Sequence, residues 1–199
     1  DRVIRSLPLR HMQRVAAKKL RRTGLHLRLA LAGEAARRGA FRRARGQEDR
    51  RRLRSADRVV VSIGKSGRTW LRVMLSRLYQ QLYQLPEHEV INFDNFHRLE
   101  PRVPRIFFTH DDFLRYVDEC GRSKRDYSHK PLLLLLRDPR DVAVSQYFHW
   151  RYRMKPRNMW LLGYPPPGAE LSMHEFVMGS GGRLRAVIHD LNAWADARP

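Results

Sequence analysis

The 199-residue sequence predicts an α/β fold in three layers, with helices flanking a central parallel sheet, preceded by a basic, mainly helical N-terminal arm. Short apolar runs at 59–63, 105–109 and 132–136 alternate with stretches of helical periodicity, a pattern typical of parallel sheets with crossover helices. Polar residues follow each run. Because such sheets bind ligands at the carboxyl ends of their strands, a binding site is expected at that edge.

The arm is assigned to residues 1–56 and the α/β domain to residues 57–199. Residues 1–58 contain 19 Lys and Arg against 5 Asp and Glu, so +14 of the formal charge of +20 lies there. Two helices are expected between residues 2 and 45, although the alternating leucines at 25–31 also fit a strand. The arginine-rich stretch 39–54 is expected to be a partly disordered connector.

Arginine-rich helices suit nucleic acid or an anionic membrane, but they are more often solvated faces. Because Phe41 is the only interleaved aromatic residue, we expect no specific nucleic-acid binding and at most weak contact with an anionic surface. No apolar run reaches the roughly 18 residues of a membrane span and no signal peptide is visible, so a cytoplasmic location is expected. The single cysteine, Cys120, excludes an internal disulfide and is expected to be an inert structural thiol.

The first strand, Val59–Ile63, leads into Gly64-Lys65-Ser66-Gly67-Arg68-Thr69-Trp70 and then into an apolar-periodic helix. Unpaired N–H groups at a helix start, with the positive end of its dipole, favour an anion. The two glycines allow close approach of the backbone, Lys65 adds a mobile charge, and Ser66 and Thr69 add hydroxyl donors. These features predict a P-loop-like arrangement of strand, phosphate loop and helix.

An ordinary strand-to-helix turn with a solvated lysine remains the alternative for this junction. The Walker pattern of nucleoside triphosphatases needs a glycine five positions before Gly64, and Val59 stands there instead. A Walker-type ATPase is therefore disfavoured.

The second strand is expected at Arg105–Thr109, after a loop at 86–104, and it ends at His110-Asp111-Asp112. A short helix from Phe113 and a third strand at Leu132–Leu136 follow. Further along, residues 151–168 are expected to be a surface loop because of their prolines. The capping box Ser172-Met173-His174-Glu175 opens a short helix, and apolar spacing predicts a last helix over 184–194.

At the third strand end, Asp138 is placed as an N-cap, Pro139 as the first helical residue and Asp141 as a first-turn acid. Arg137 then lies at the end of the strand, where its fork of donors suits a phosphate. Ser145 lies two turns into the helix and offers one more donor. The alternative is that Arg137 pairs with a carboxylate and Ser145 is a neutral surface residue.

Together, Lys65-Ser66-Gly67-Arg68-Thr69-Trp70 and Arg137-Asp138-Pro139-Arg140-Asp141-Val142-Ala143-Val144-Ser145 closely resemble the two signatures of sulfotransferases that use 3'-phosphoadenosine 5'-phosphosulfate. The first resembles the 5'-phosphosulfate loop and the second resembles the 3'-phosphate site. The resemblance covers roughly residues 57–197. It implies an enzyme that transfers a sulfuryl group from this donor to a hydroxyl or amine acceptor without a metal.

The resemblance also implies roles. Lys65 would stabilise the leaving oxygen, His110 would be the general base, Trp70 would stack on adenine, and Arg137 and Ser145 would bind the 3'-phosphate. The 5'-phosphate would be bound by the backbone and hydroxyls of Ser66, Gly67, Arg68 and Thr69. Without the resemblance, Trp70 fits core packing and His110 fits a hydrogen-bonded strand end. No metal-ligand spacing includes His110, and Asp111 is expected to cap the next helix.

Three departures from the family are visible. Arg68 stands where many members have threonine, and Phe108 replaces a lysine that cytosolic members often place two residues before the base. The family's Arg-Lys-Gly segment is not found before Pro199, so the domain is expected to be incomplete at its C-terminus.

Two other functions remain open: a kinase-like P-loop nucleotide-binding protein, or a non-catalytic basic binding module that keeps the sulfotransferase fold. A small-molecule, lipid, carbohydrate or peptide acceptor would fit the enzyme reading equally well. Seven aromatic residues, which more often belong to a core, could line an acceptor pocket: Phe93, Phe96, Phe107, Phe113, Tyr147, Phe148 and Trp150.

Overall fold

The computed structural model describes residues 32–117 and 124–197. The chain divides into two compact units, residues 1–40 and 41–199, and the sheet belongs to the second. The helices predicted before residue 32 and the thiol of Cys120 lie outside the described residues.

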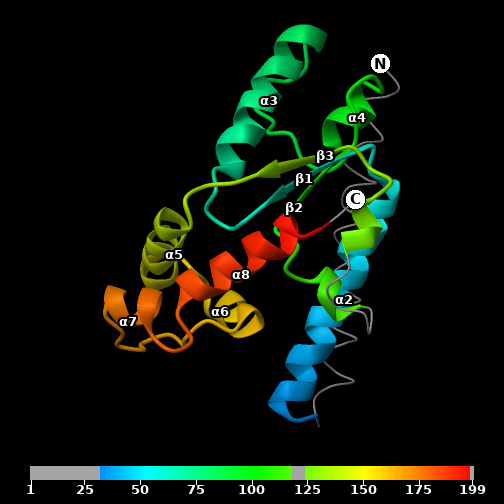
Figure 1. Cartoon of the computed structure of the whole chain (residues 1–199). Coiled ribbons are helices and arrows are strands. Elements are labelled where there is room, and N and C mark those ends of the chain that lie inside the picture. Colours follow the sequence, from blue (N-terminus) through cyan, green and yellow to red (C-terminus); the bar gives the residue numbers. More distant parts are fainter. Residues whose placement is uncertain (1–31, 118–123, 198–199) are drawn as a thin grey trace. The chain divides into compact units, whose positions relative to one another are not determined.

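Three short strands form a parallel sheet in the order β2-β1-β3 (Figure 1). They are β1 (Arg58–Ser62), β2 (Ile106–Thr109) and β3 (Leu132–Leu135). Val60 of the central strand pairs with Phe108 on one side and Leu133 on the other. The α/β class and the parallel pairing predicted from the sequence are therefore confirmed.

The two faces of the sheet pack against different helices, because alternate residues of a strand point to opposite faces. Val59 and Val61 pack with Leu53 of α2 (Glu34–Ser55) and with Trp194 of α8 (Arg183–Ala195). On the other face, Val60 packs with residues of α3 (Arg68–Tyr83) and of α4 (Asn95–Leu99). The carboxyl edge of the sheet is thereby placed between two helical layers.

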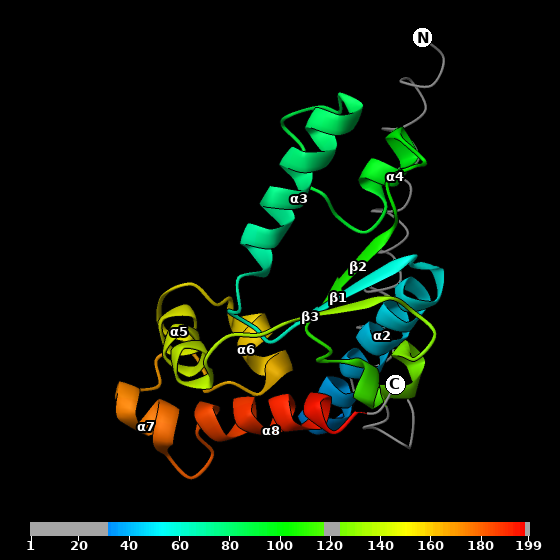
Figure 2. The ribbon, with the colours of Figure 1, turned by 45° about the horizontal axis from the view of Figure 1, so that its top comes forward.

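Beyond β3, α5 (Pro139–Tyr152) packs against α7 (Met173–Met178) and α8 (Figure 2). The rings of Trp150 and Phe176 stack with centroids 5.0 Å apart in this cluster, which also includes Met159 of α6 (Pro156–Leu162). Two short 3-10 helices, η1 (Leu114–Tyr116) and η2 (Lys124–Tyr127), lie between β2 and β3.

The predicted helix starts at Asp138 and Ser172 are confirmed. The Asp138 carboxylate accepts a hydrogen bond from the Arg140 backbone N–H at 2.9 Å, and Pro139 opens α5. Ser172 and Glu175 form both bonds of a capping box at the start of α7. The register of α5 relative to the end of β3 therefore follows from local sequence.

Three stretches that the sequence assigned to loops or a connector contain helices. α2 runs through 39–54, α4 lies within 86–104, and α6 lies within 151–168. In α2, Leu53 is 2% exposed and packs with the sheet, so tertiary contacts stabilise this arginine-rich helix. The second compact unit begins at Phe41, within α2.

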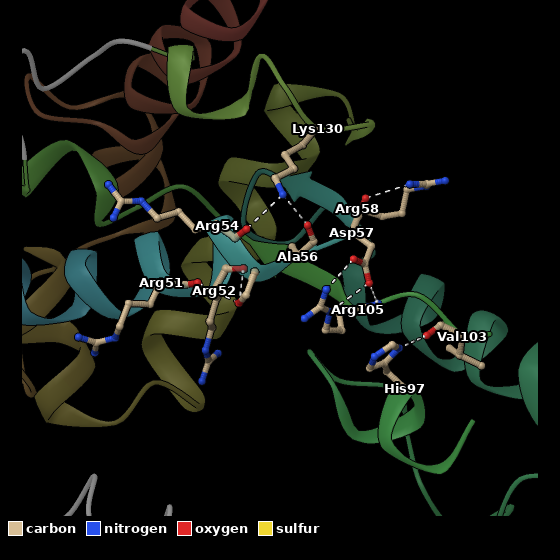
Figure 3. A network of polar contacts seen from close by, with 11 residues as sticks. Arg51, Arg52, Arg54, Ala56, Asp57, Arg58, His97, Val103, Arg105 and Lys130 are labelled. Atoms are coloured by element: carbon tan, nitrogen blue, oxygen red, sulfur yellow. Dashed lines mark hydrogen bonds and ion pairs between the residues drawn. The ribbon is translucent and has the colours of Figure 1, made fainter. Parts of the chain in front are cut away.

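Paired charges hold the amino ends of the strands (Figure 3). The Asp57 carboxylate accepts two hydrogen bonds from the Arg105 guanidinium, at 2.8 and 3.1 Å. The Lys130 ammonium donates to the carbonyl oxygens of Ala56 at 2.8 Å and Arg54 at 3.2 Å. These contacts tie the residues just before β1, β2 and β3 to one another and to the end of α2.

Over residues 32–117 and 124–197, no helix combines the length and the apolarity needed to cross a membrane.

Candidate anion site at the carboxyl edge of the sheet

The loop between β1 and α3 has a backbone that only specific residues tolerate easily. Lys65 has φ 76 and Gly67 has φ 94, both in the left-handed region. The turn is closed by the Ser66 N–H, which donates to the Ile63 carbonyl at 3.1 Å. A left-handed lysine costs free energy, and conformations of this kind cluster at functional sites.

Several polar groups of this loop have no hydrogen-bond partner among the residues that the structure describes. Gly67 is the N-cap of α3 and supplies no side-chain cap, so the first N–H groups of the helix are left without one. The Ser66 hydroxyl is buried, with the residue 7% exposed, and it has no hydrogen-bond partner in the described chain. A bound anion would satisfy both the hydroxyl and the helix start.

Arg137 joins the two sequence motifs in space. Its Nη1 donates to the Lys65 carbonyl oxygen at 3.3 Å, although the residues are 72 positions apart. Its Nη2 lies 3.3 Å from the Asp141 carboxylate, so the predicted alternative of a carboxylate partner is present as well. Both side chains of that ion pair are about half exposed, and such pairs contribute at most about 1 kcal/mol.

α5 and α8 also fix the loop. Gln146 Nε2 donates a hydrogen bond to the Gly64 carbonyl oxygen at 3.5 Å. Gln146 Oε1 accepts a hydrogen bond from Arg183 Nε at 2.9 Å. Gln146 is 4% exposed. This part-buried chain of contacts positions the start of the loop against α5.

Lys65 lies among cations. Burial, then the charges of Arg153 and Arg137, lower the pKa of its ammonium below the ordinary value. Burial, Lys65 and Arg153 likewise lower the pKa of His149. Positive charges held close together disfavour the protonated forms of Lys65 and His149. An anion bound between them would favour the protonated forms and raise both pKa values.

The sequence interpretation considered His149 only as a conceivable metal ligand, which it rejected, and gave no anion-binding role to His149 or Arg153. A signal for them was available, because they continue the four-residue spacing of Asp141 and Ser145 along one side of α5. Ser145 is partly buried and lies in this series between Asp141, which pairs with Arg137, and His149, which is near Lys65. Ser145 therefore shares the face of α5 that is directed at the loop.

Trp70 is 75% exposed, which excludes the core-packing alternative, and Thr69 is exposed as well. The other aromatic candidates are mostly core: Phe96, Phe107, Phe113 and Trp150 are all less than 9% exposed, whereas Phe148 is 42% exposed. A cavity of about 370 Å³ lies away from the loop, beside Trp150 and Met159.

His110 follows β2 and lies beside the end of β1. Its Nδ1 is 2.7 Å from the Ser62 carbonyl oxygen. A carbonyl only accepts, so Nδ1 carries the hydrogen and Nε2 keeps its lone pair. Burial, then the charge of Arg68, lower the pKa of His110 to about 4, against the opposing effect of the Ser62 bond. The imidazole is therefore neutral at pH 7 and able to accept a proton through Nε2.

The sequence predicted that Asp111 caps the next helix, and this prediction is wrong. The N-cap of η1 is Phe113, without a side-chain cap bond. The Asp111 carboxylate instead accepts from Tyr127 Oη at 2.8 Å and from Lys124 Nζ. The Asp111 backbone lies in the left-handed region, with φ 58. In the described ranges, no three His, Cys, Asp or Glu side chains form a group that could hold a metal ion.

Comparison with known proteins gave no match to a family model, to a curated protein or to a solved structure.

Proposed function

We propose that this chain is a sulfotransferase that uses 3'-phosphoadenosine 5'-phosphosulfate and transfers the sulfuryl group to a hydroxyl or amine acceptor. Residues 57–199 would form a P-loop-like domain for this reaction. The proposal combines the resemblance of the two motifs with the geometry of the carboxyl edge of the sheet.

The observation that carries the proposal is the contact between Arg137 and the backbone of Lys65. It brings the phosphosulfate-type loop and the 3'-phosphate-type motif side by side, as a donor with a phosphate at each of two ribose positions requires. The partnerless Ser66 hydroxyl and the uncapped start of α3 add support, since both would bind a phosphate oxygen.

In the proposed reaction, the acceptor hydroxyl gives its proton to Nε2 of His110 while its oxygen attacks sulfur. The bond between sulfur and the bridging oxygen of the donor breaks, and the electron pair stays on the phosphate oxygen. Lys65 neutralises that oxygen, and Arg137 with Ser145 binds the 3'-phosphate. Trp70, largely exposed beside the loop, is free to stack on the adenine ring.

Calorimetric titration with adenosine 3',5'-bisphosphate tests the proposal. Arg137→Ala should weaken binding by about 1.5 to 3 kcal/mol, because it removes a charge-assisted bond. The matched control is Arg140→Ala, since this arginine lies in the same turn but is 80% exposed and pairs with Asp138. The affinity of the Arg140→Ala variant for the bisphosphate should stay at the wild-type value.

Unchanged affinity in Arg137→Ala, or no binding by the wild type, would contradict the proposed donor site. A parallel titration with ATP and magnesium distinguishes the kinase-like alternative, which requires tighter binding of that ligand. Binding of the bisphosphate with no transfer from the phosphosulfate to any acceptor tested would favour a non-catalytic binding module.

A further inference from the structure

Arg68 is the first residue of α3. The residue is partly buried. Over the described parts of the chain, its guanidinium makes no hydrogen bond and no ion pair. A guanidinium carries five N–H donors, so a partly buried one without partners is suited to a ligand.

The packing of α3 on β2 indicates what Arg68 faces. α3 covers the face of the sheet that carries Ile106 and Phe108. The guanidinium carbon of Arg72 lies over the Phe108 ring, 5.7 Å from its centroid.

α3 returns across the sheet in the direction opposite to the parallel strands. One turn of α3 and two residues of a strand span similar lengths. A step of one turn back along α3 therefore matches a step of about two residues forward along the same face of β2. Because Arg68 precedes Arg72 by four residues and His110 follows Phe108 by two, Arg68 is placed next to His110.

The electrostatics agree with this placement. Arg68 is the charged side chain with the largest effect on His110, ahead of Lys65. The positive charge of Arg72 opposes the charged form of Arg68, and the carboxyl groups of Asp112 and Asp49 favour it, without forming an ion pair with it in the described ranges. Arg68 therefore interacts electrostatically with His110 and with two acids, while its guanidinium donors have no partner among the described residues.

We propose that the Arg68 side chain is a catalytic group that binds the oxygens of the sulfuryl group as it passes from the donor to the acceptor beside His110. This inference rests on the proposed sulfotransferase function. β2 offers no cation of its own here, because Phe108 occupies the nearest position on the same face. Arg68 supplies this charge from α3, and Lys65 remains at the bridging oxygen.

One consequence concerns the base. The bound sulfuryl group places negative charge against Arg68 and offsets its effect on the imidazole. The pKa of His110 therefore rises towards its ordinary value when the donor is bound. His110 becomes a stronger base only in the presence of the group to be transferred.

A matched pair of ligands tests the assignment without knowledge of the acceptor. Adenosine 3',5'-bisphosphate lacks the sulfuryl group that 3'-phosphoadenosine 5'-phosphosulfate carries. We expect Arg68→Met to weaken binding of the phosphosulfate about tenfold to a hundredfold, and binding of the bisphosphate less than about twofold. Arg68→Lys should recover part of the loss. Arg77→Met is the control, because Arg77 lies on α3 with its side chain 53% exposed and pairs with Glu87.

A second readout is the NMR titration of His110 in the free protein. Arg68→Met should raise the pKa of His110, and Arg68→Lys should leave it near the wild-type value. A purely structural role for Arg68 would lower the unfolding temperature without this selective effect.

The outcomes separate the two proposals. If the wild type binds neither ligand, the proposed function fails and the role of Arg68 fails with it. If the wild type binds both ligands and Arg68→Met weakens both equally, or neither, the donor site stands and the role of Arg68 is wrong.

Discussion

The two ends of the sheet differ in whether their charged side chains have partners. At the amino end, Asp57 is matched to Arg105, and Lys130 is matched to two backbone carbonyls. At the carboxyl end, the side chains of Lys65 and Arg68 have neither hydrogen bond nor ion pair within the described ranges. The matched charges link the residues that precede the strands, whereas unmatched cations beside an uncapped helix are what the proposed anion site requires.

The titration behaviour of each end follows from this difference. The Arg105 hydrogen bonds lower the pKa of Asp57 to about 2, so the amino end favours the charged form. Burial and neighbouring cations lower the pKa of Lys65, so the carboxyl end opposes its charged form. Groups of the second kind are typical of functional sites, because a ligand relieves the electrostatic cost.

Removing a reacting group at the carboxyl end should have the largest effect. His110→Ala and Lys65→Met are each expected to reduce donor turnover by about 10² to 10⁴, since a general base or a transition-state donor is lost. The release of adenosine 3',5'-bisphosphate from the phosphosulfate measures this turnover. Near-normal turnover with an intact fold in either variant would refute the role of that residue.

The next largest effect is expected in the pH dependence of the free energy of unfolding, through His110 at the carboxyl end of the sheet. Because the pKa of folded His110 is about 4 and that of free histidine about 6.5, the unfolded chain binds more protons between these values. The free energy of unfolding should therefore fall as the pH is lowered from 6.5 to 4, by up to about 3 kcal/mol from this group.

Burial raises the pKa of Asp112 to about 6, which acts in the opposite direction over much of the same range. The contribution of His110 is thus the difference between the wild type and His110→Asn in urea unfolding at each pH. Parallel pH profiles of the two proteins would show that His110 is not held neutral by the fold.

Trp70→Ala should affect ligand binding and not stability. A base stacked on an aromatic ring contributes about 1 to 3 kcal/mol, and a side chain that is 75% exposed adds little to the core. Calorimetry with the bisphosphate and the thermal unfolding midpoint measure the two effects. A clear fall in the midpoint with unchanged affinity would mean that Trp70 packs against the protein instead.

The smallest effect is expected at the amino end. Asp57→Ala removes the partner of Arg105, but the ion pair is about one-third exposed, so we expect a loss of only about 1 kcal/mol in the free energy of unfolding. Affinity for the bisphosphate should not change. Weaker binding in this variant would mean that the two ends are coupled and would break the comparison.

The sequence predicted the parts of the fold that depend on local signals. A β-branched run predicted β1, and Asp138 with Pro139 predicted the start of α5. α6 was missed because Pro156 was taken as a loop marker, although proline suits the first turn of a helix. Gly163, at φ 75 just past its end, completes a signal that was present.

The connector interpretation of α2 failed for a reason that lies outside local sequence. A Cβ on Gly46 would come within 2.3 Å of Val117 Cγ2 and 2.4 Å of the Phe113 carbonyl oxygen, so the helix passes very close to this segment. Likewise, the two motifs could be recognised from the sequence, but their contact through Arg137 could not. Long-range packing determines both features.

The most direct test of the difference between the two ends is an NMR titration of the backbone amides with adenosine 3',5'-bisphosphate. The account predicts saturable shifts of the amides at 64–70 and 137–149, with Asp57, Arg105 and Lys130 nearly unmoved. Shifts centred on the amino end or distributed over the basic surface, or no saturable shifts, would contradict an anion site at the carboxyl edge of the sheet.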